Sequence, residues 1–327
     1  MSHIKDTDYL GISTRIHAME NRMLTRERME RTRQRGAELI AENRLPGGGE
    51  TIEPQNLEQV LSAERASAFR EIRSALPDKR IADVFQIKYD YHNAKVLVKA
   101  QALGKDGERL RPSAGRYDPQ ELLEGWRKEE LRGLSDTFRV ALKQAQETLA
   151  ATKDPQLSDL VLDRACYEEM AQLAKETGSK FLQGYVALSV DVANLRTAVR
   201  VHRMDKGSDF LSQVLLPGGS VSTRSIAAQR GEELSSLFQA GPLAAAAELG
   251  SKLAQPGAGA LTAFERECDN ALTTYLEAAR RLGTVPAETV VFDSIFQRRE
   301  VVNDIGSDSS AQLRLLDERG NVVLETT

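Results

Sequence analysis

The sequence predicts an all-α protein built of three tandem, structurally similar helical bundles, and three observations lead to this expectation. Ala, Leu, Glu and Arg, which lose little side-chain entropy in a helix, are abundant, whereas aromatic residues make up only 5% of the chain. Apolar residues recur at intervals of three and four, as they do on one face of a helix. One short pattern occurs twice, 101 residues apart, which is the spacing of a repeated domain rather than of a short-period solenoid.

The composition is that of a folded, water-exposed protein with a balanced charge. The chain has 327 residues, of which 41% are hydrophobic and 28% charged, so it is long enough to bury a large core without disulfide bonds or a metal. Its 44 basic and 48 acidic residues give a net charge of −4. A general nucleic-acid binder usually has a basic excess, so we expect no nucleic-acid partner.

The first expected helix covers residues 9–35 and has a strongly basic surface. Ile12, Ile16, Met19 and Met23 share one face of it. Its many arginines fit either a solvated helix face or docking onto an acidic partner. Glycines at residues 47–49 then predict a loop.

Further helices and loops follow in order. Helices are expected at residues 55–75, 80–104, 118–130, 132–152, 156–177, 180–202, 223–239, 241–253, 261–282 and 287–304. Residues 216–220 read as a loop, because they combine Pro with two glycines. The tail after Gly306 is compatible with either a small hairpin or a frayed end.

The repeated pattern is an acid and an amide one helical turn apart. It occurs first at Asp90 and Asn93 and again at Asp191 and Asn194, beside an apolar stripe in each case. Asp and Asn are disfavoured in helix interiors, so we expect each pair to bond a neighbouring backbone or a basic side chain. A weaker third copy is formed by Glu300 and Asn303. The three repeats would cover roughly residues 1–110, 111–212 and 213–327.

In order and spacing, these segments resemble the C-subunit family of V/A-type ATPases, whose eukaryotic relatives are called d subunits. The resemblance rests on the stretches YLGISTRI (9–16), YDYHNAK (89–95), YVALSVDVANLRT (185–197), LPGG (216–219) and FERECDNAL (264–272). It runs from about residue 7 to 303. The chain departs from the family pattern at residues 43–50 and again after Pro286, where the family continues with a long helix pair.

The resemblance implies a mechanical rather than a catalytic role. Members of that family fold as a funnel of three similar bundles around a pseudo-threefold axis. The wide end of the funnel sits on the membrane proteolipid ring, and central stalk subunits D and F plug into its cavity. The resemblance thus implies a rotor component at the cytoplasmic face of the membrane that transmits torque between ATP turnover and proton or sodium transport.

The residues themselves suggest no enzyme and no membrane segment. No glycine-rich loop is followed by Lys and Ser or Thr, as a phosphate-binding loop requires, so no cofactor is expected. No histidine or cysteine has metal-ligand spacing, and Cys166 and Cys268 read as small core residues. His92 reads as a partly exposed helix residue. We also expect neither a signal peptide nor a membrane-spanning helix, because the apolar runs are too short.

Two other classes remain as alternatives. The first is a free-standing helical scaffold or adaptor, which would not copurify with a proteolipid ring. The second is a helical enzyme, which would need a polar pocket with titratable groups. Asp90 and Asp191 would do acid–base chemistry only if held close together with different pKa values, and equivalent positions in two repeats favour equivalent structural roles instead.

Overall fold

A computed structural model describes residues 9–20, 57–105, 107–281, 314–316 and 322–325 of the chain. The chain falls into two compact units. Unit 1 contains residues 1–79, 112–114 and 285–327, and unit 2 contains residues 80–111 and 115–284. The division into three sequence repeats stays a prediction.

Unit 1 contains two described helices and a hairpin. Helix α1 (Leu10–Glu20) packs against α4 (Leu57–Ala75). Ile12, Ile16 and Met19 are buried on α1, while Met23 and the rest of the basic segment lie outside the described residues. Strands β1 (Arg314–Leu316) and β2 (Val322–Glu325) pair antiparallel, which is the hairpin alternative for the tail.

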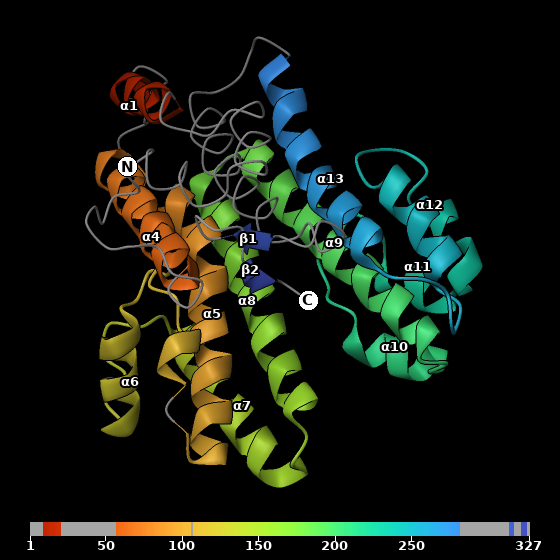
Figure 1. Ribbon diagram of the computed structural model, residues 1–327, viewed down its shortest axis with the longest axis horizontal. Coiled ribbons are helices and arrows are strands. Elements are labelled where there is room, and N and C mark those ends of the chain that lie inside the picture. The colour runs from red at the N-terminus through yellow and green to blue at the C-terminus, as the bar shows by residue number, and fades with distance from the viewer. Residues whose placement is uncertain (1–8, 21–56, 106, 282–313, 317–321, 326–327) are drawn as a thin grey trace. The chain divides into compact units, whose positions relative to one another are not determined.

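Unit 2 is helical throughout its described part (Figure 1). Its longer helices are α5 (Arg80–Leu103), α7 (Asp136–Thr152), α8 (Pro155–Thr177), α9 (Lys180–Arg203), α12 (Ala244–Leu253) and α13 (Thr262–Arg281). The shorter ones are η2 (Glu108–Leu110), α6 (Pro119–Arg127), α10 (Ser208–Val214), α11 (Thr223–Ala228) and η3 (Gly231–Leu237). With strands confined to the hairpin of unit 1, the described chain belongs to the all-α class.

The helices of unit 2 form two groups that share α9 as a common neighbour. Helices α5, α7 and α8 pack against one another, and α9 packs on α8. The other side of α9 carries α10, α11, α12 and α13, as the green and blue ribbons of Figure 1 show. Because it is covered from several sides, α9 is buried along most of its length.

Side-chain caps set the start of many of these helices. Asp118 and Asp154 accept hydrogen bonds from backbone N–H groups of the first turns of α6 and α8, and Pro follows each of them. Ser135, Ser179 and Ser222 do the same for α7, α9 and α11. The cap at Ser135 explains why α7 begins at Asp136, four residues later than the sequence predicted.

The sequence-based expectations were wrong in two places within unit 2. The expected helix at residues 223–239 is divided into α11 and the 3₁₀ helix η3, with extended backbone at Gln229 and Arg230. The chain turns there because it passes close to another element: a Cβ on Gly231 would lie 2.8 Å from that of Ala254. Helix α10 was not expected, since it is short and lies in a polar stretch.

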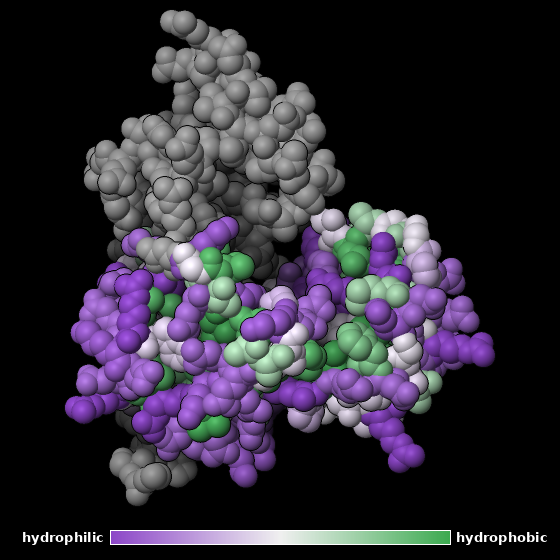
Figure 2. All heavy atoms as spheres, turned by 90° about the horizontal axis from the view of Figure 1, so that it is seen from below, coloured by the Kyte–Doolittle hydropathy of each residue, from purple (hydrophilic) through white to green (hydrophobic). Residues whose placement is uncertain are grey.

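The core of unit 2 is made by side chains that point between α5, α7, α8, α9 and α13. The largest fully buried ones include Tyr91, Phe138, Leu162, Tyr185 and Phe264. The ring of Tyr91 meets that of Phe138 edge-on, with centroids 5.0 Å apart. On the face shown in Figure 2, hydrophilic residues cover most of the described surface, with smaller apolar areas between them.

Candidate functional site

The acid–amide pairs predicted from the repeat lie on α5 and α9 of unit 2, and their acids hold two loops in the same way. We call Asp90, Gly115, Arg116 and Tyr117 the first anchor. Asp191, Gly219, Ser220 and Val221 form the second anchor. In both, a buried carboxylate on a long helix accepts hydrogen bonds from two consecutive backbone N–H groups that follow a glycine.

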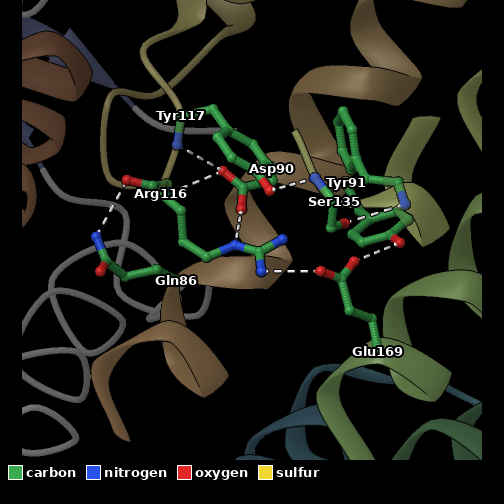
Figure 3. A network of polar contacts seen from close by, with 9 residues as sticks. Gln86, Asp90, Tyr91, Arg116, Tyr117, Ser135 and Glu169 are labelled. Carbon is green, nitrogen blue, oxygen red and sulfur yellow. Dashed lines mark hydrogen bonds and ion pairs between the residues drawn. The ribbon is translucent and has the colours of Figure 1, made fainter. Parts of the chain in front are cut away.

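In the first anchor, Asp90 is fully buried and binds the loop through both carboxylate oxygens. Its Oδ1 accepts from the N–H groups of Arg116 at 2.8 Å and Tyr117 at 3.2 Å. Its Oδ2 lies 2.6 Å from Nε of Arg116 (Figure 3). Gly115 is required for this approach, because a Cβ at that position would overlap Oδ1 of Asp90.

The side chain of Arg116 extends the first anchor to α8. Its Nη1 lies 2.9 Å from Oε1 of Glu169, and the hydroxyl of Tyr91 donates to Oε2 of the same carboxylate at 2.8 Å. The side chains of Arg116 and Glu169 are each only 8% exposed. One guanidinium therefore joins two buried carboxylates from different helices (Figure 3).

Two more bonds complete the surroundings of this loop. Gln86, one turn before Asp90 on α5, donates from Nε2 to the carbonyl of Gly115 at 3.0 Å. The hydroxyl of Tyr117 accepts from the N–H of Ser135, the cap of α7, at 3.0 Å. The first anchor thus connects α5, α7 and α8 (Figure 3).

Burial and charge change the acidity of the groups in the first anchor. Burial raises the pKa of Asp90 to about 6, although Arg116 and the two backbone N–H groups oppose the shift. Burial, and then the charge of Glu169, raise the pKa of Tyr91 well above its ordinary value. Burial by itself would lower the pKa of Arg116, but Asp90 and Glu169 raise it, so the guanidinium stays charged.

In the second anchor, Asp191 is 2% exposed and is held by backbone N–H groups and a hydroxyl. Its Oδ2 accepts from the N–H of Ser220 at 2.9 Å and from the Ser220 hydroxyl. Its Oδ1 accepts from the N–H of Val221 at 3.2 Å. A Cβ on Gly219 would overlap that same oxygen, as at Gly115 in the first anchor.

The predicted amides lie one turn beyond the acids. Asn194 accepts from the N–H of Leu216 and donates to its carbonyl, each at 2.8 Å, so it binds both backbone groups of one residue. Asn93 is fully buried on α5. Glu300 and Asn303, the predicted third pair, lie outside the described residues.

The two anchors are followed by equivalent elements. Asp118 and Ser222, each next after its anchor, cap α6 and α11. The ion pairs between neighbouring helices also correspond: Lys95 on α5 lies 2.6 Å from Asp163 on α8. Arg196 on α9 lies 2.5 Å from Glu265 on α13.

The buried faces of α8 and α13 match in the same register. Leu162, Cys166, Met170 and Ala174 are buried on α8, and Phe264, Cys268, Leu272 and Leu276 are buried on α13. Each residue of the second set lies 102 positions after its counterpart. The two cysteines are free and buried, as the sequence predicted for core residues, and burial raises the pKa of both thiols to about 12.

The sequence identified the acids and the loop at residues 216–220, but not the contact between each acid and its loop. Gly115 and Gly219 each stand three residues before a helix cap, and that shared spacing was the available signal. Arg116 gave no signal, because Ser220 takes its place in the second anchor. Glu169 gave none either, since Ala271 stands 102 residues after it.

The acids and His92 each have bonding partners within the described fold. Asp90 and Asp191 bind separate loops, each through its own backbone partners. His92 is exposed, and its Nε2 donates to the carbonyl of Leu110 at 2.9 Å. In the part of the chain that the structure describes, no three or more His, Cys, Asp or Glu side chains are grouped to hold a metal. Nor does any described helix combine the length and hydropathy needed to cross a membrane.

Comparison with known proteins gives a match over most of the chain. The family model described as ATP synthase (C/AC39) subunit matches residues 12–286, which include both anchors. The sequence is 24% identical to the C subunit of the V-type sodium ATPase of Enterococcus hirae over 167 residues, or 51% of each chain.

Two further relatives have the same kind of name. The C subunit of the A-type ATP synthase of Thermococcus gammatolerans is 25% identical over 232 residues, which are 66% of this chain and 63% of the relative. The C subunit of the V-type ATP synthase of Thermus thermophilus is 25% identical over 119 residues, or 35% of this chain and 37% of the relative. The matches thus span between about a third and just under two thirds of these relatives.

Proposed function

Because the chain belongs to the ATP synthase (C/AC39) subunit family, we propose that it is a non-catalytic central-stalk component of a V/A-type rotary ATPase. The match of the family model over residues 12–286 is the observation that carries this proposal. The names of the relatives, which are C subunits of V-type and A-type enzymes, support it. In this role the chain links the stalk to the membrane proteolipid ring and transmits torque between ATP turnover and proton or sodium translocation.

A torque-transmitting protein must resist bending, and the packing of unit 2 supports that requirement. Helix α9 is buried along most of its length among α8 and α10–α13. Each anchor ties a loop to a long helix through a buried carboxylate, so these two connections are bonded to a helix as well as joined to it along the chain. A mobile connection at either place would let neighbouring helices slide under load.

We further propose that the acid–amide pair occurs once in each of three tandem repeats. Asp90, Asn93, Asp191 and Asn194 would each fix a loop to the inner helix of a bundle, and Glu300 and Asn303 would do so in the third. The repeats would cover roughly residues 1–110, 111–212 and 213–327 and would form a funnel with pseudo-threefold symmetry. The equivalent geometry of the two anchors supports two of these repeats.

The proposed partners follow from the same role. Central stalk subunits D and F would bind in the funnel, and the proteolipid ring would carry its wide end. The protein would therefore be peripheral, at the cytoplasmic face of the membrane, and part of a membrane-bound complex without a membrane-spanning helix of its own. It would need no cofactor, no metal and no nucleic acid.

Affinity purification of the full tagged chain from native membranes tests the assignment. We expect the other stalk proteins and the proteolipid to copurify with it. Recovery of the chain alone, or with a set of proteins containing no ATPase component, would support the alternative of a free-standing helical scaffold. A second tag, on a catalytic component of the same ATPase, should recover this chain in return.

A depletion experiment tests torque transmission separately from membership. Complexes that lack the chain should still hydrolyse ATP but should no longer couple hydrolysis to ion transport, and adding the purified chain should restore coupling. Reversing the charge of first-helix arginines, including the exposed Arg15, should weaken assembly while the chain stays folded. If depleted complexes transport ions as well as intact ones do, the mechanical role is wrong.

A further inference from the structure

The first anchor contains a buried group of charges whose signs do not balance. Asp90 and Glu169 share the guanidinium of Arg116, and the hydroxyl of Tyr91 donates to Glu169. We call these four residues the Asp90 cluster (Figure 3). With both acids ionised, the cluster has two negative charges and one positive charge, at side chains that are between 0% and 8% exposed.

A single added proton would make the cluster neutral. An unpaired charge in a low-dielectric interior is costly, whereas one guanidinium with one carboxylate is a balanced pair. Asp90 is the more deeply buried of the two acids, and its burial favours the neutral form more strongly than Arg116 and the two loop N–H groups oppose it. Protonation at Oδ2 would remove the ion pair between Asp90 and Arg116. Arg116 would stay paired with Glu169, and Oδ1 of Asp90 would still accept from the two loop N–H groups.

The other ionisable groups of unit 2 near Asp90 do not remove this imbalance. Arg116 and Tyr117 of the loop act on Asp90 directly, and Glu169 and Tyr91 join it through Arg116. Cys166 on α8 also interacts with Asp90, and its own further neighbours are Lys88, Lys95 and Asp163. Lys95 is paired with Asp163, and Lys88 lies over the ring of Tyr185. Helix α7 contributes Phe138 and its cap Ser135, which carry no charge.

We propose that the Asp90 cluster is a proton-binding site that fastens the loop at residues 115–117 to α5 and α8 more tightly as the medium becomes mildly acidic. This inference goes beyond the proposed stalk role, because it concerns the response of unit 2 to pH and does not depend on which partners the chain binds. In the second anchor, Asp191 is bound by uncharged groups, the N–H groups of Ser220 and Val221 and the Ser220 hydroxyl, so the proposal is confined to the first anchor.

The direction of the effect follows from linkage. The pKa of Asp90 is about 6 in the folded chain against an ordinary value of 3.8, so the folded state binds the proton first. The stabilisation due to this proton is fully present below the ordinary pKa and is lost as pH rises through about 6. The same reasoning holds for local opening of the loop, which would expose Asp90 to water and restore its ordinary acidity.

Unfolding equilibria at two pH values test the proposal with a reporter that the chain already contains. Trp126, the only tryptophan, lies on α6 directly after the first anchor, and its Nε1 donates to Gln101 on α5. The test compares urea unfolding of the full chain, followed by Trp126 fluorescence, between the unsubstituted protein and Asp90→Asn. The asparagine matches the shape of the neutral acid but binds no proton.

Between pH 7.5 and pH 5, the unfolding constant of the unsubstituted chain should fall about tenfold relative to that of Asp90→Asn. Gly207→Ala is the matched control, because Gly207 has room for a methyl group and the change adds no titratable group; its ratio to the unsubstituted chain should not vary with pH. A ratio for Asp90→Asn that is equally constant overturns the proposal.

A direct titration keeps the test independent of whether the variant folds. Carbon NMR of the Asp90 carboxyl in the unsubstituted chain should show an inflection near pH 6, and an inflection below about pH 4.5 overturns the proposal. Glu169→Gln should move that inflection to lower pH, because Arg116 then serves Asp90 alone. An unmoved inflection contradicts the sharing of the guanidinium by two acids.

Discussion

The two anchors of unit 2 have the same backbone arrangement but use different side chains. In each, a buried aspartate accepts two consecutive loop N–H groups, and the glycine before them lies against the carboxylate. The first anchor adds the buried ion pairs of Arg116, whereas the second adds the Ser220 hydroxyl. The same backbone arrangement therefore holds a network of charged side chains in the first anchor, whereas the partners of the aspartate in the second anchor are uncharged.

Comparing the two anchors shows which residues hold the loop and which only surround it. The aspartate and the glycine occur in both anchors, so they are the parts that the backbone arrangement requires. The residue after the glycine differs, because its side chain is free to adapt to the facing helix: α8 presents Glu169 to Arg116. Substitutions in the common part should thus have similar effects in both anchors, and substitutions in the variable part should not.

The largest expected effect is at the variable part of the first anchor. Arg116→Met removes the positive charge shared by Asp90 and Glu169, and it should lower the free energy of unfolding by about 3–5 kcal/mol. Urea unfolding followed by Trp126 fluorescence measures the change. The double variant Arg116→Met with Glu169→Gln should recover part of the loss, and no recovery would mean that charge imbalance is not its cause.

The next effect should be shared by both anchors. Gly115→Ala and Gly219→Ala each place a methyl group where the aspartate oxygen lies, so each should cost about 2–3 kcal/mol through displacement of the loop. The control is Gly259→Ala, at an exposed glycine with room for a methyl group, which should change stability by less than about 0.5 kcal/mol. A large effect at only one of the two anchors would contradict the conclusion that the glycine has the same role in both.

Removing the carboxylate of the second anchor should have an intermediate effect. Asp191→Ala leaves the N–H groups of Ser220 and Val221 without their acceptor, which should cost about 1–3 kcal/mol. Hydrogen exchange at these two amides should become faster than in the unsubstituted chain. Unchanged melting together with unchanged exchange would show that the carboxylate does not hold the loop.

The smallest effect is expected at the variable part of the second anchor. Ser220→Ala removes one uncharged hydrogen bond donor and keeps the backbone bond to Asp191, so it should cost only about 1 kcal/mol. Thermal unfolding of this variant beside Arg116→Met measures the contrast directly. Equal losses at the two positions would contradict the division into common and variable parts.

The helical class and the two acid–amide pairs could be predicted from the sequence, because both depend on periodicity along single helices. Asp90 and Asp191 stand out as polar residues beside apolar stripes. The rest of the network could not be found in this way, since Arg116 reaches Asp90 from a loop and Glu169 reaches Arg116 from another helix. The break between α11 and η3 was also hidden, because it results from the close approach of Gly231 and Ala254.

The segments that join each carboxylate to its loop differ in length, and this has a practical consequence. From Asp90 to Gly115 the chain advances 25 positions, and from Asp191 to Gly219 it advances 28, yet both loops return to the same place on their helices. The position of each loop on its helix is therefore fixed by the hydrogen bonds to the aspartate, and not by the length of the segment that leads to the loop. The exposed turn at Asp205 and Lys206, directly before α10, is accordingly a suitable position for inserting a fluorescent label or an epitope without disturbing the helices.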